Sequence, residues 1–396
     1  MAIAARDDRT AGPIRLGMVG GGQGAFIGGV HRIAARLDGE FQLVAGALSS
    51  DPERARASAA ELGLDPARSY GSFEEMARAE AARSDGIEAV SIVTPNHMHW
   101  PAAEAFLNAG IHVICDKPLT SSLADARKLA ALVEKSGRLF VLTHNYTGYP
   151  MVRQAREMIR AGEIGDIRVV QAEYPQDWLT EKVEETGSKQ AGWRTDPSKS
   201  GAGGATGDIG THAYNLARFV SGLELDTLAA DLSAFVDGRR VDDNAHVMLR
   251  FKAMGGAPAA KGMLWASQVA PGNENALRLR VYGTKGGLEW EQEQPNHLWY
   301  TPFGEPKRLI TRGGAGAGAA AARVSRIPGG HPEGYLEGFA TIYCEAARAI
   351  RALREGTTLP DDAIFPTVHD GVEGVAFIEA CVRSSNENGA WTRLDS

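Results

Sequence analysis

Residues 13–31 read PIRLGMVGGGQGAFIGGVH, and this stretch decides the fold of the first half of the chain. An apolar run at residues 14–19 leads into a glycine-rich turn that contains Gln23, and helix-forming residues continue to Leu37. A strand, a glycine-rich turn and a helix in this order are typical of a dinucleotide-binding unit, because small residues let backbone N–H groups approach a pyrophosphate. The stretch therefore predicts a dinucleotide site at this turn, with Gln23 among its contacts.

The glycine spacing departs from the simplest form of this pattern. Gly20 and Gly22 fit the first two positions, where the chain must turn tightly and approach the ligand closely. The third position falls to Ala25 by strict count, or to Gly28 if the residues between form a short insertion. We favour Gly28 and expect the helix to begin after Gly29.

The ribose of a dinucleotide is expected to meet the end of the second strand, residues 41–48. An acidic residue at this place binds the 2′-hydroxyl of NAD, whereas this chain has Ser49 and Ser50 there and Arg54 one turn later. Hydroxyls and a guanidinium suit a 2′-phosphate better than a carboxylate does. Asp51 could also accept from a ribose hydroxyl, but we expect it to cap the next helix. The sequence therefore favours NADP over NAD.

Further apolar runs of strand type follow at residues 89–93, 112–115 and 139–143, with helical segments between them. Strands that alternate with helices predict an α/β fold with a right-handed, doubly wound parallel sheet. Residues 13–145 are therefore expected to form a Rossmann domain that binds NAD(P). Residues 1–12 have no apolar core and are expected to be a flexible tail.

Polar residues follow the strand at residues 89–93, and they could line a nicotinamide or adenine pocket. The predicted cofactor contacts here are Thr94, Pro95, Asn96 and His97. For His97 and the nearby His99 the preferred interpretation is that of solvated side chains at a helix start.

The next strand leads into a turn with reactive side chains, since residues 112–119 read HVICDKPL. The carboxyl ends of parallel strands form the edge at which open α/β folds bind ligands. Pro118 restricts Lys117 to an extended backbone, which would hold its ammonium at the rim of the cleft beside Asp116. A surface lysine before a loop proline is the alternative interpretation.

The second half of the chain, residues 146–396, has a different pattern. Several runs alternate polar and apolar residues with a period of two, which predicts a large, mostly antiparallel open sheet in an α+β domain. These runs are at residues 167–174, 228–236, 244–251, 262–270 and 277–282. We expect this domain to bind substrate and to form a homo-oligomer, a dimer or a tetramer, through the open sheet. Residues 313–322 are only glycine and alanine and are expected to form a mobile loop.

A second chemical cluster lies in this half, where residues 203–213 read GGATGDIGTHA. Asp208 and His212 are four residues apart, so they share a face if the segment is helical. A carboxylate beside an imidazole can hold its orientation and support its protonated form. The alternative is a helix-capping aspartate and an exposed histidine. The sequence shows no obvious further ligands near the pair, so no metal site is predicted.

Composition narrows the class of protein. The chain has 396 residues, a formal net charge of −7 and three widely separated cysteines. Mild acidity argues against nucleic acid as the main partner, and no apolar run reaches the length of a membrane span. A low, odd cysteine count fits a reducing compartment better than a disulfide scaffold. A cytoplasmic enzyme is expected, without a nucleic-acid or membrane partner.

Together these motifs resemble the glucose–fructose oxidoreductase/inositol dehydrogenase (Gfo/Idh/MocA) family over nearly the whole chain. The pattern of that family is a glycine-rich turn followed by a histidine, a Glu-Lys-Pro turn and an Asp-x-x-x-His helix. Here these are the turn at residues 20–28 with His31, the turn at residues 116–118, and the pair Asp208 and His212.

Two departures from the family pattern concern charge. Asp116 replaces the usual glutamate, which is a mild chemical change. Ser49 stands where NAD-using members commonly have an acid, and this resembles the NADP-dependent branch of the family.

The resemblance implies reversible hydride transfer between a hydroxyl of a sugar or cyclic polyol and NAD(P). By the same resemblance His212 is the general acid/base, Lys117 binds the reacting oxygen, and Asp208 orients the substrate or His212. The predicted substrate contacts are Lys117, Asn145, Tyr146, Trp193, Arg194, Asp208 and His212, with Lys199 and His331 as further loop candidates. Arg194 and Lys199 could also bind a carboxylate or phosphate. Two rival functions stay open: an NAD-dependent glycosidase that acts by transient oxidation, and a non-catalytic dinucleotide sensor.

Overall fold

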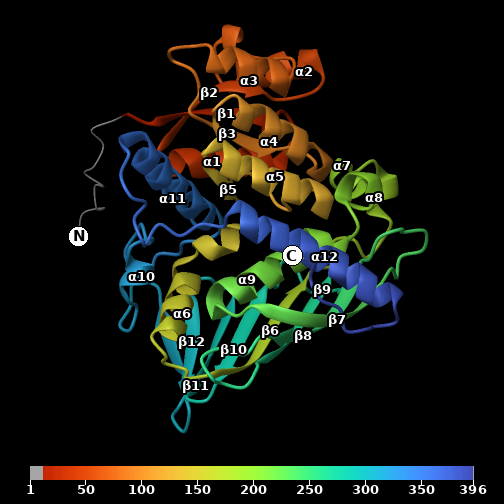
Figure 1. Ribbon diagram of the computed structural model, residues 1–396, viewed down its shortest axis with the longest axis vertical. Helices are drawn as coiled ribbons and strands as arrows, with labels where there is room; N and C mark the ends of the chain where they lie inside the picture. The colour runs from red at the N-terminus through yellow and green to blue at the C-terminus, as the bar shows by residue number, and fades with distance from the viewer. Residues whose placement is uncertain (1–11, 396) are drawn as a thin grey trace.

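The computed structural model describes residues 12–395. Most of the predicted tail, residues 1–11, lies outside the described residues. Figure 1 shows two sheets, with the N-terminal sheet and its helices at the top, the larger sheet at the bottom, and α9 (Thr211–Ser221) and α12 (Val368–Asn386) between them. Within residues 12–395, none of the helices is long and apolar enough to cross a membrane.

The N-terminal sheet has five parallel strands in the order β2-β1-β3-β4-β5. Their bounds are β1 (Ile14–Gly20), β2 (Phe41–Ala47), β3 (Ala89–Val93), β4 (His112–Cys115) and β5 (Phe140–Leu142). The helices between them are α1 (Phe26–Leu37), α2 (Pro52–Glu61), α3 (Phe73–Ala81), α4 (His99–Asn108) and α5 (Leu123–Ser136). The order reverses beside β1, so the carboxyl ends of β1 and β3 flank the crevice where such sheets bind ligands. The predicted doubly wound parallel sheet is confirmed.

The second sheet has eight strands in the order β13-β12-β11-β10-β6-β9-β8-β7. Their bounds are β6 (Ile167–Pro175), β7 (Leu225–Ser233), β8 (Asn244–Phe251), β9 (Lys261–Ser267), β10 (Arg278–Gly283), β11 (Gly286–Glu291), β12 (His297–Pro302) and β13 (Arg308–Thr311). Only the pair β6 and β9 is parallel among the described strands of this sheet. The prediction of a large, mostly antiparallel sheet is therefore confirmed.

Helices bury one face of the large sheet and leave the other exposed. Apolar side chains of α6 (Pro150–Arg160), α9 and α12 share one core with the inward residues of the strands. On the opposite face the exposed fractions of Met248, Met263 and Trp299 are 55%, 41% and 39%. The sheet is thus open on one side, as the alternating pattern indicated.

The C-terminal helices also tie the two sheets together. Helix α11 (Tyr335–Glu355) packs against α1 and shares a core with strands of the N-terminal sheet, at the left of Figure 1. Residues of α12 contribute to the core on the other face of the N-terminal sheet as well as to that of the large sheet. The chain therefore returns to its first sheet after completing the second.

Two local expectations were wrong. Helix α1 begins at Phe26 instead of after Gly29, so Gly28 lies inside its first turn. In the glycine–alanine segment, residues 319–322 form the short helix α10 (Ala319–Ala322), which packs against α6 with Ala321 buried. Alanine is the best helix former, and this contact gives the short helix a surface to pack on.

Candidate active site

A cavity of about 1130 Å³ lies where the carboxyl edge of the N-terminal sheet faces the large sheet. Its walls come from the glycine turn, from the ends of β2, β3, β4 and β5, from α7 (Lys189–Arg194) and from the turn before α9. The predicted residues that line it are Gly20, Ser49, Ser50, Thr94, Pro95, Asn96, His97, Asp116, Lys117, Asn145, Tyr146, Trp193, Arg194, Asp208 and His212. The structure thus brings both predicted chemical clusters into one space.

The glycine turn has the tight backbone path that a dinucleotide site requires, because only glycine fits at several of its positions. Gly20 has a positive φ of 78°, which non-glycine residues rarely adopt. A Cβ at Gly22 would lie 2.7 Å from the carbonyl oxygen of Leu48, and one at Gly28 only 2.4 Å from the Cα of Gly21. Gly28 therefore allows the close contact between helix and turn that the third glycine of the fingerprint provides.

The serines after β2 lie at the far end of the cavity from Lys117. Ser49 and Ser50 line the cavity, and Ser49 Oγ accepts from the backbone N–H of Asp51. Asp51 caps α2 by accepting from the Arg54 N–H at 2.7 Å, so its predicted capping role is confirmed. Arg54 itself is exposed and lies outside the residues that line the cavity.

Gln23 also lies outside the cavity lining. Its side-chain amide donates to Glu61 and its backbone N–H donates to Ser58 Oγ, each at 3.0 Å. These contacts hold the glycine turn against α2 instead of directing Gln23 toward a ligand.

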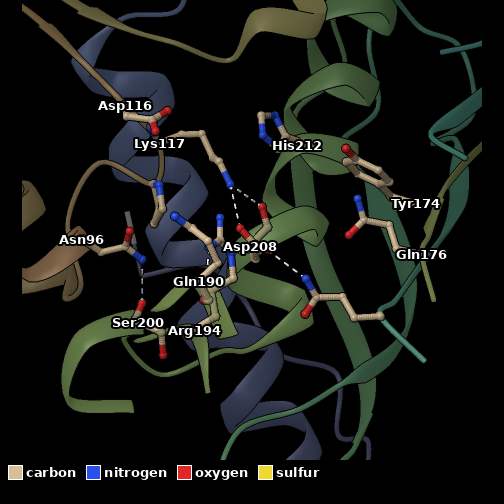
Figure 2. Close-up of polar contacts among 12 residues, drawn as sticks. Asn96, Asp116, Lys117, Tyr174, Gln176, Gln190, Arg194, Ser200, Asp208 and His212 are labelled. Atoms are coloured by element: carbon tan, nitrogen blue, oxygen red, sulfur yellow. Dashed lines mark hydrogen bonds and ion pairs between the residues drawn. The ribbon is translucent and has the colours of Figure 1, made fainter. Parts of the chain in front are cut away.

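The loop after β3 lines the middle of the cavity with few charges. Thr94 Oγ1 is buried and has no hydrogen-bond partner among the described residues, so it is available to a ligand. Asn96 instead donates to the carbonyl oxygen of Ser200 at 3.0 Å and joins this loop to α8 (Pro197–Ser200), as Figure 2 shows. His97 is exposed at the cavity edge.

His99 differs from the expectation of a solvated side chain, because it is fully buried. Its ring nitrogens lie 2.8 Å from the carbonyl oxygen of Pro118 and 2.9 Å from that of Thr94. Burial lowers the pKa of His99, and the neutral ring has one N–H, with which it donates to one of these two carbonyl oxygens. His99 thus connects the loop after β3 to the turn that carries Lys117.

Asp116 is fixed at the end of β4 by neighbours from three elements. Its Oδ1 accepts from the backbone N–H of Lys117 at 2.9 Å and from Thr143 Oγ1 at 3.1 Å. His31 Nε2 lies 4.0 Å from the same oxygen, while Nδ1 of that ring is 2.8 Å from the hydroxyl of Tyr343. Burial lowers the pKa of His31 to about 4, so this histidine is neutral at pH 7.

Asp208 receives hydrogen bonds from three side chains, and Figure 2 shows two of these donors, Lys117 and Arg194, beside it. Lys117 Nζ donates to Asp208 Oδ1 at 3.0 Å and to the Asp208 carbonyl oxygen at 2.6 Å. Arg194 Nε and Gln268 Nε2 donate to Oδ2 at 2.9 and 2.8 Å. Burial alone would raise the pKa of this carboxyl, but the positive charges of Arg194 and Lys117 outweigh it and hold the pKa well below its usual value. Asp208 is therefore an ionised anchor for both cations.

A buried carboxylate shapes the turn that carries Asp208. Residues Thr206–Gly210 form one π-helical turn before α9, a feature that often occurs at functional sites. The two carboxylate oxygens of Asp242 accept from the backbone N–H groups of Gly204 and Thr206, both at 2.7 Å. The predicted helix is thus present from Thr211, and a wider turn precedes it.

His212 lies in the first turn of α9 and its ring lines the cavity. Its Nδ1 is 3.5 Å from Nδ1 of His144, and the two rings are nearly perpendicular. Burial, the charge of Lys117 and the neighbouring His144 lower the pKa of His212 well below its usual value, against the opposing effect of Asp208. His212 is therefore neutral at pH 7 and able to accept a proton. Hydrogen bonds to Asp208 in the described structure come from other residues, so Asp208 acts on His212 through charge alone.

The remaining predicted contacts divide into two groups. Trp193 lies beneath the guanidinium of Arg194, 4.2 Å from its ring centre, and Asn145 has a buried Nδ2 without a partner in the described structure. These two residues line the cavity, whereas Lys199 and His331 do not. Lys199 instead pairs with Asp196, and His331 is exposed outside the cavity lining.

Sequence reasoning missed a group of neutral polar side chains on the large-sheet side of the cavity. They are Tyr174, Gln176, Gln190, Asn275 and Gln292, with Trp178 beside them. They belong to no motif. Tyr174, Gln176, Asn275 and Gln292 lie at or beside the ends of strands, which is their only signal, whereas Gln190 lies in α7. Among residues 12–395 no group of three or more His, Cys, Asp or Glu side chains is arranged to hold a metal ion.

Comparison with known proteins agrees with this architecture. Residues 14–144 match the oxidoreductase family with an NAD-binding Rossmann fold, and residues 152–289 match the GFO/IDH/MocA C-terminal domain. The chain is 37% identical over 386 residues to an uncharacterized oxidoreductase of Bacillus subtilis, covering 96% of this chain and 97% of that one. A levoglucosan dehydrogenase of Pseudarthrobacter phenanthrenivorans is 30% identical over 310 residues, covering 72% and 75%.

Solved structures also resemble this chain over nearly its whole length. An oxidoreductase from Sinorhizobium meliloti is 65% identical with a TM-score of 0.89, and the match covers 97% of this chain and 100% of that one. An inositol dehydrogenase homologue from Azotobacter vinelandii, complexed with NADH and myo-inositol, is 36% identical with a TM-score of 0.89, covering 97% and 98%.

Proposed function

The chain belongs to the Gfo/Idh/MocA family of NAD(P)-dependent oxidoreductases, and from this premise we propose that it transfers a hydride between a hydroxyl of a sugar or cyclic polyol and nicotinamide. One observation carries the proposal. Lys117, at the end of a strand in the dinucleotide-binding sheet, meets Asp208 and His212 from the other half of the chain in one cavity. Alcohol oxidation needs a proton acceptor and a positive group at the reacting oxygen, and this convergence supplies both.

The protein residues have separate roles in this proposal. Neutral His212 accepts the hydroxyl proton, and its depressed pKa keeps it unprotonated beforehand. The Lys117 ammonium hydrogen-bonds the reacting oxygen and favours its anionic form, while Asp208 holds that ammonium in place. A bound nicotinamide would supply the hydride acceptor. Gly20 lines the cavity where the pyrophosphate would bind, and Gly22 and Gly28 allow the tight turn behind it. Asp116, Thr94, Pro95, Asn96 and His97 line the cavity between this turn and Lys117.

The substrate class is supported by the relatives and by the lining. One relative is a levoglucosan dehydrogenase, and one solved homologue holds myo-inositol. In this chain Tyr146 and Trp193 offer aromatic faces, while Asn145 offers an unpaired amide donor. Aromatic faces and amides suit sugar rings and their hydroxyls.

The cofactor is proposed to be NAD(P), with the preference decided at the end of β2. Relatives at modest identity include NADP-dependent xylose dehydrogenases, and the inositol dehydrogenase homologue holds NADH. The prediction in favour of NADP rests on Ser49 and Ser50, since Arg54 is outside the cavity lining.

We propose that the two halves of the chain have separate functions and that the boundary between them lies between residues 145 and 146. Residues 13–145 would bind NAD(P), and residues 146–396 would bind substrate and form a homo-oligomer through the open face of the large sheet. The exposed Met248, Met263 and Trp299 on that face support a subunit contact.

The proposed function is tested by a screen of sugars and inositols with NAD and with NADP, in which absorbance reports the reduced cofactor. Formation of NAD(P)H supports a dehydrogenase. Release of aglycone from aryl glycosides without NAD(P)H formation would favour a glycosidase instead.

A further inference from the structure

We propose that the wall of the cavity facing Lys117 selects uncharged polyhydroxylated ligands and rejects carboxylated or phosphorylated ones, with Asn275 as its positioning residue. The proposal rests on the function proposed above and adds the charge class of the substrate. The wall consists of Tyr146, Tyr174, Gln176, Asn275 and Gln292, which all line the cavity. None of these side chains carries a charge at neutral pH.

Asn275 lies at the centre of this wall and uses its whole amide. Its Oδ1 accepts from the Tyr174 hydroxyl at 2.7 Å and from Gln176 Nε2 at 2.8 Å. Its Nδ2 donates to Gln292 Oε1 at 3.0 Å and lies 3.5 Å from the Tyr146 hydroxyl. An asparagine amide offers two donor hydrogens and one acceptor oxygen. Turning it over would break these contacts, so its neighbours fix its orientation.

The proton positions on the two tyrosines follow from this arrangement. Tyr174 has one hydroxyl hydrogen and donates it to Asn275 Oδ1. Tyr146 and Tyr174 are also hydrogen-bonded to each other, so Tyr146 must be the donor in that contact. Both phenol oxygens therefore keep lone pairs, while their hydrogens point away from a ligand.

The two glutamines supply the donors of the wall. Gln176 Oε1 accepts from the Trp178 indole at 3.1 Å, which together with Asn275 fixes its amide. Gln292 Nε2 donates to the Tyr149 hydroxyl at 3.3 Å. Each amide group retains a second N–H without a partner in residues 12–395. The wall thus presents N–H donors beside phenol lone pairs.

This mixture suits a hydroxyl, which donates and accepts, better than an anion. A carboxylate or phosphate only accepts at its charged oxygens, so the phenol lone pairs would face it without a hydrogen between them. Burying an unpaired polar contact of this kind is unfavourable. The wall therefore hydrogen-bonds the hydroxyls of the substrate that lie away from its reacting carbon, which is held at Lys117 and His212.

The charged side chains around the cavity also disfavour anionic ligands. Its lysine and arginine side chains, Lys117 and Arg194, both pair with Asp208. Glu274 and Glu293 also line the cavity and are exposed at its edge. Among the lining side chains that the structure describes, an anionic substrate would meet the carboxylates of Glu274 and Glu293, while both cations are already paired with Asp208, which disfavours its entry.

The first test compares matched ligands on the wild-type protein with saturating NAD(P). In the first set D-glucose is the neutral member, and D-glucuronate and D-glucose 6-phosphate are its anionic partners. In the second set myo-inositol is neutral and myo-inositol 1-phosphate is anionic. We expect kcat/KM for the neutral member to exceed that of its anionic partners by about 100-fold or more, since a site built for hydroxyls discriminates strongly. Equal or higher values for an anionic member would overturn the selection of uncharged ligands, while leaving the dehydrogenase function standing.

The second test removes single donors. Gln176→Leu and Gln292→Leu should each raise KM for the neutral substrate by roughly tenfold, the effect of one lost neutral hydrogen bond, and change kcat little. Asn275→Asp, which keeps the acceptor oxygen but cannot donate, should raise KM as well. Gln294→Leu is the matched control, because Gln294 is exposed and outside the cavity lining. KM values equal to those of Gln294→Leu in all three variants would refute the role of the wall.

Equilibrium binding decides the question even without turnover. Trp178 and Trp193 line the cavity, so their fluorescence reports a bound ligand in the presence of NADH. Tighter binding of the neutral members supports the proposal, and equal or tighter binding of the anions, or no binding of any member, overturns it. If every neutral and anionic ligand fails to reduce NAD(P), the proposed dehydrogenase function fails separately.

Discussion

The ammonium of Lys117 lies 3.0 Å from Oδ1 of Asp208 and 2.6 Å from its carbonyl oxygen, which joins the end of β4 to the turn before α9. The contact orders the Lys117 side chain before substrate arrives. A substrate oxygen that binds between Lys117 and His212 can use an ammonium whose position is already fixed. Such preorganised charge stabilises developing negative charge more effectively than mobile groups do.

Removal of the imidazole of His212 should abolish most turnover. We expect His212→Ala to lower kcat/KM for polyol oxidation by roughly a hundred- to ten-thousandfold, the range of general-base catalysis. Binding of NAD(P), followed by fluorescence of the reduced cofactor, should change little, because the glycine turn is at the other end of the cavity. The matched control is His246→Ala on the open sheet face, and equal turnover in the two variants would rule out His212 as the base.

The pH dependence of oxidation should reflect the lowered pKa of His212. Its burial and the charge of Lys117 keep the ring neutral below its usual pKa of about 6.5. The acidic limb of kcat/KM, measured with saturating NAD(P), should therefore lie below pH 6.5. An acidic limb of kcat/KM at or above about pH 6.5 that is absent when His212 is replaced would show that His212 is not held neutral.

Stability limits how far that profile can be followed into acid. The folded-state pKa values of His31 and His144 are lowered to about 4 and about 3 by burial. Below about pH 6.5 the unfolded chain binds more protons than the folded one, so the free energy of unfolding falls as pH falls toward these values. Each such histidine contributes up to about 1.4 kcal/mol per pH unit in this window. Circular dichroism at each pH separates this loss from a catalytic limb.

A carboxylate at the end of β2 should act against NADP. We expect Ser49→Asp to raise the ratio of kcat/KM with NAD to kcat/KM with NADP by tenfold or more, because the 2′-phosphate would meet a like charge. Asp231→Asn, an exposed change outside the cavity, serves as a control for general effects. An unchanged ratio would show that the 2′ position does not lie beside Ser49.

Charge on the open sheet face should weaken self-association. Met248→Glu combined with Met263→Glu places two carboxylates on adjacent strands of that face, where Met248 and Met263 are paired across β8 and β9. Burying them in a subunit contact would be costly without partners. Sedimentation velocity should show a smaller species than wild type, with the same thermal midpoint in dilute solution if the subunits fold independently. An unchanged size would place the contact elsewhere.

The parallel sheet and its glycine turn followed from sequence because local signals specify them. Ile14 to Gly20 and the glycines after it combine strand propensity, turn chemistry and helix formation in consecutive residues. The start of α1 was misplaced, since Gly28 reads locally as part of the turn, whereas its contact with Gly21 fixes it inside the helix. Contacts across the turn, not propensity, decided that boundary.

The charged part of the site was also predictable, and the neutral part was not. Lys117, Asp208 and His212 stand out by residue type and spacing, and the structure brings them together. Tyr174 and Gln176 become neighbours of Asn275 only because β6 pairs with β10, a strand far from it in sequence. A period-two pattern identifies strands but not which strands are adjacent, so the wall of amides could not be assembled from sequence.

The most direct test of the central claim uses Lys117→Ala beside the wild-type protein, with the best neutral polyol or sugar from the screen. The measurement is the rate of NAD(P)H formation at saturating cofactor, together with the dissociation constant of NAD(P)H. We predict that wild type reduces the cofactor, and that Lys117→Ala binds it within a few fold of wild type but loses turnover by about a hundredfold or more. Equal turnover in the two proteins would contradict the assignment of Lys117 to the reacting oxygen and with it the proposed active site.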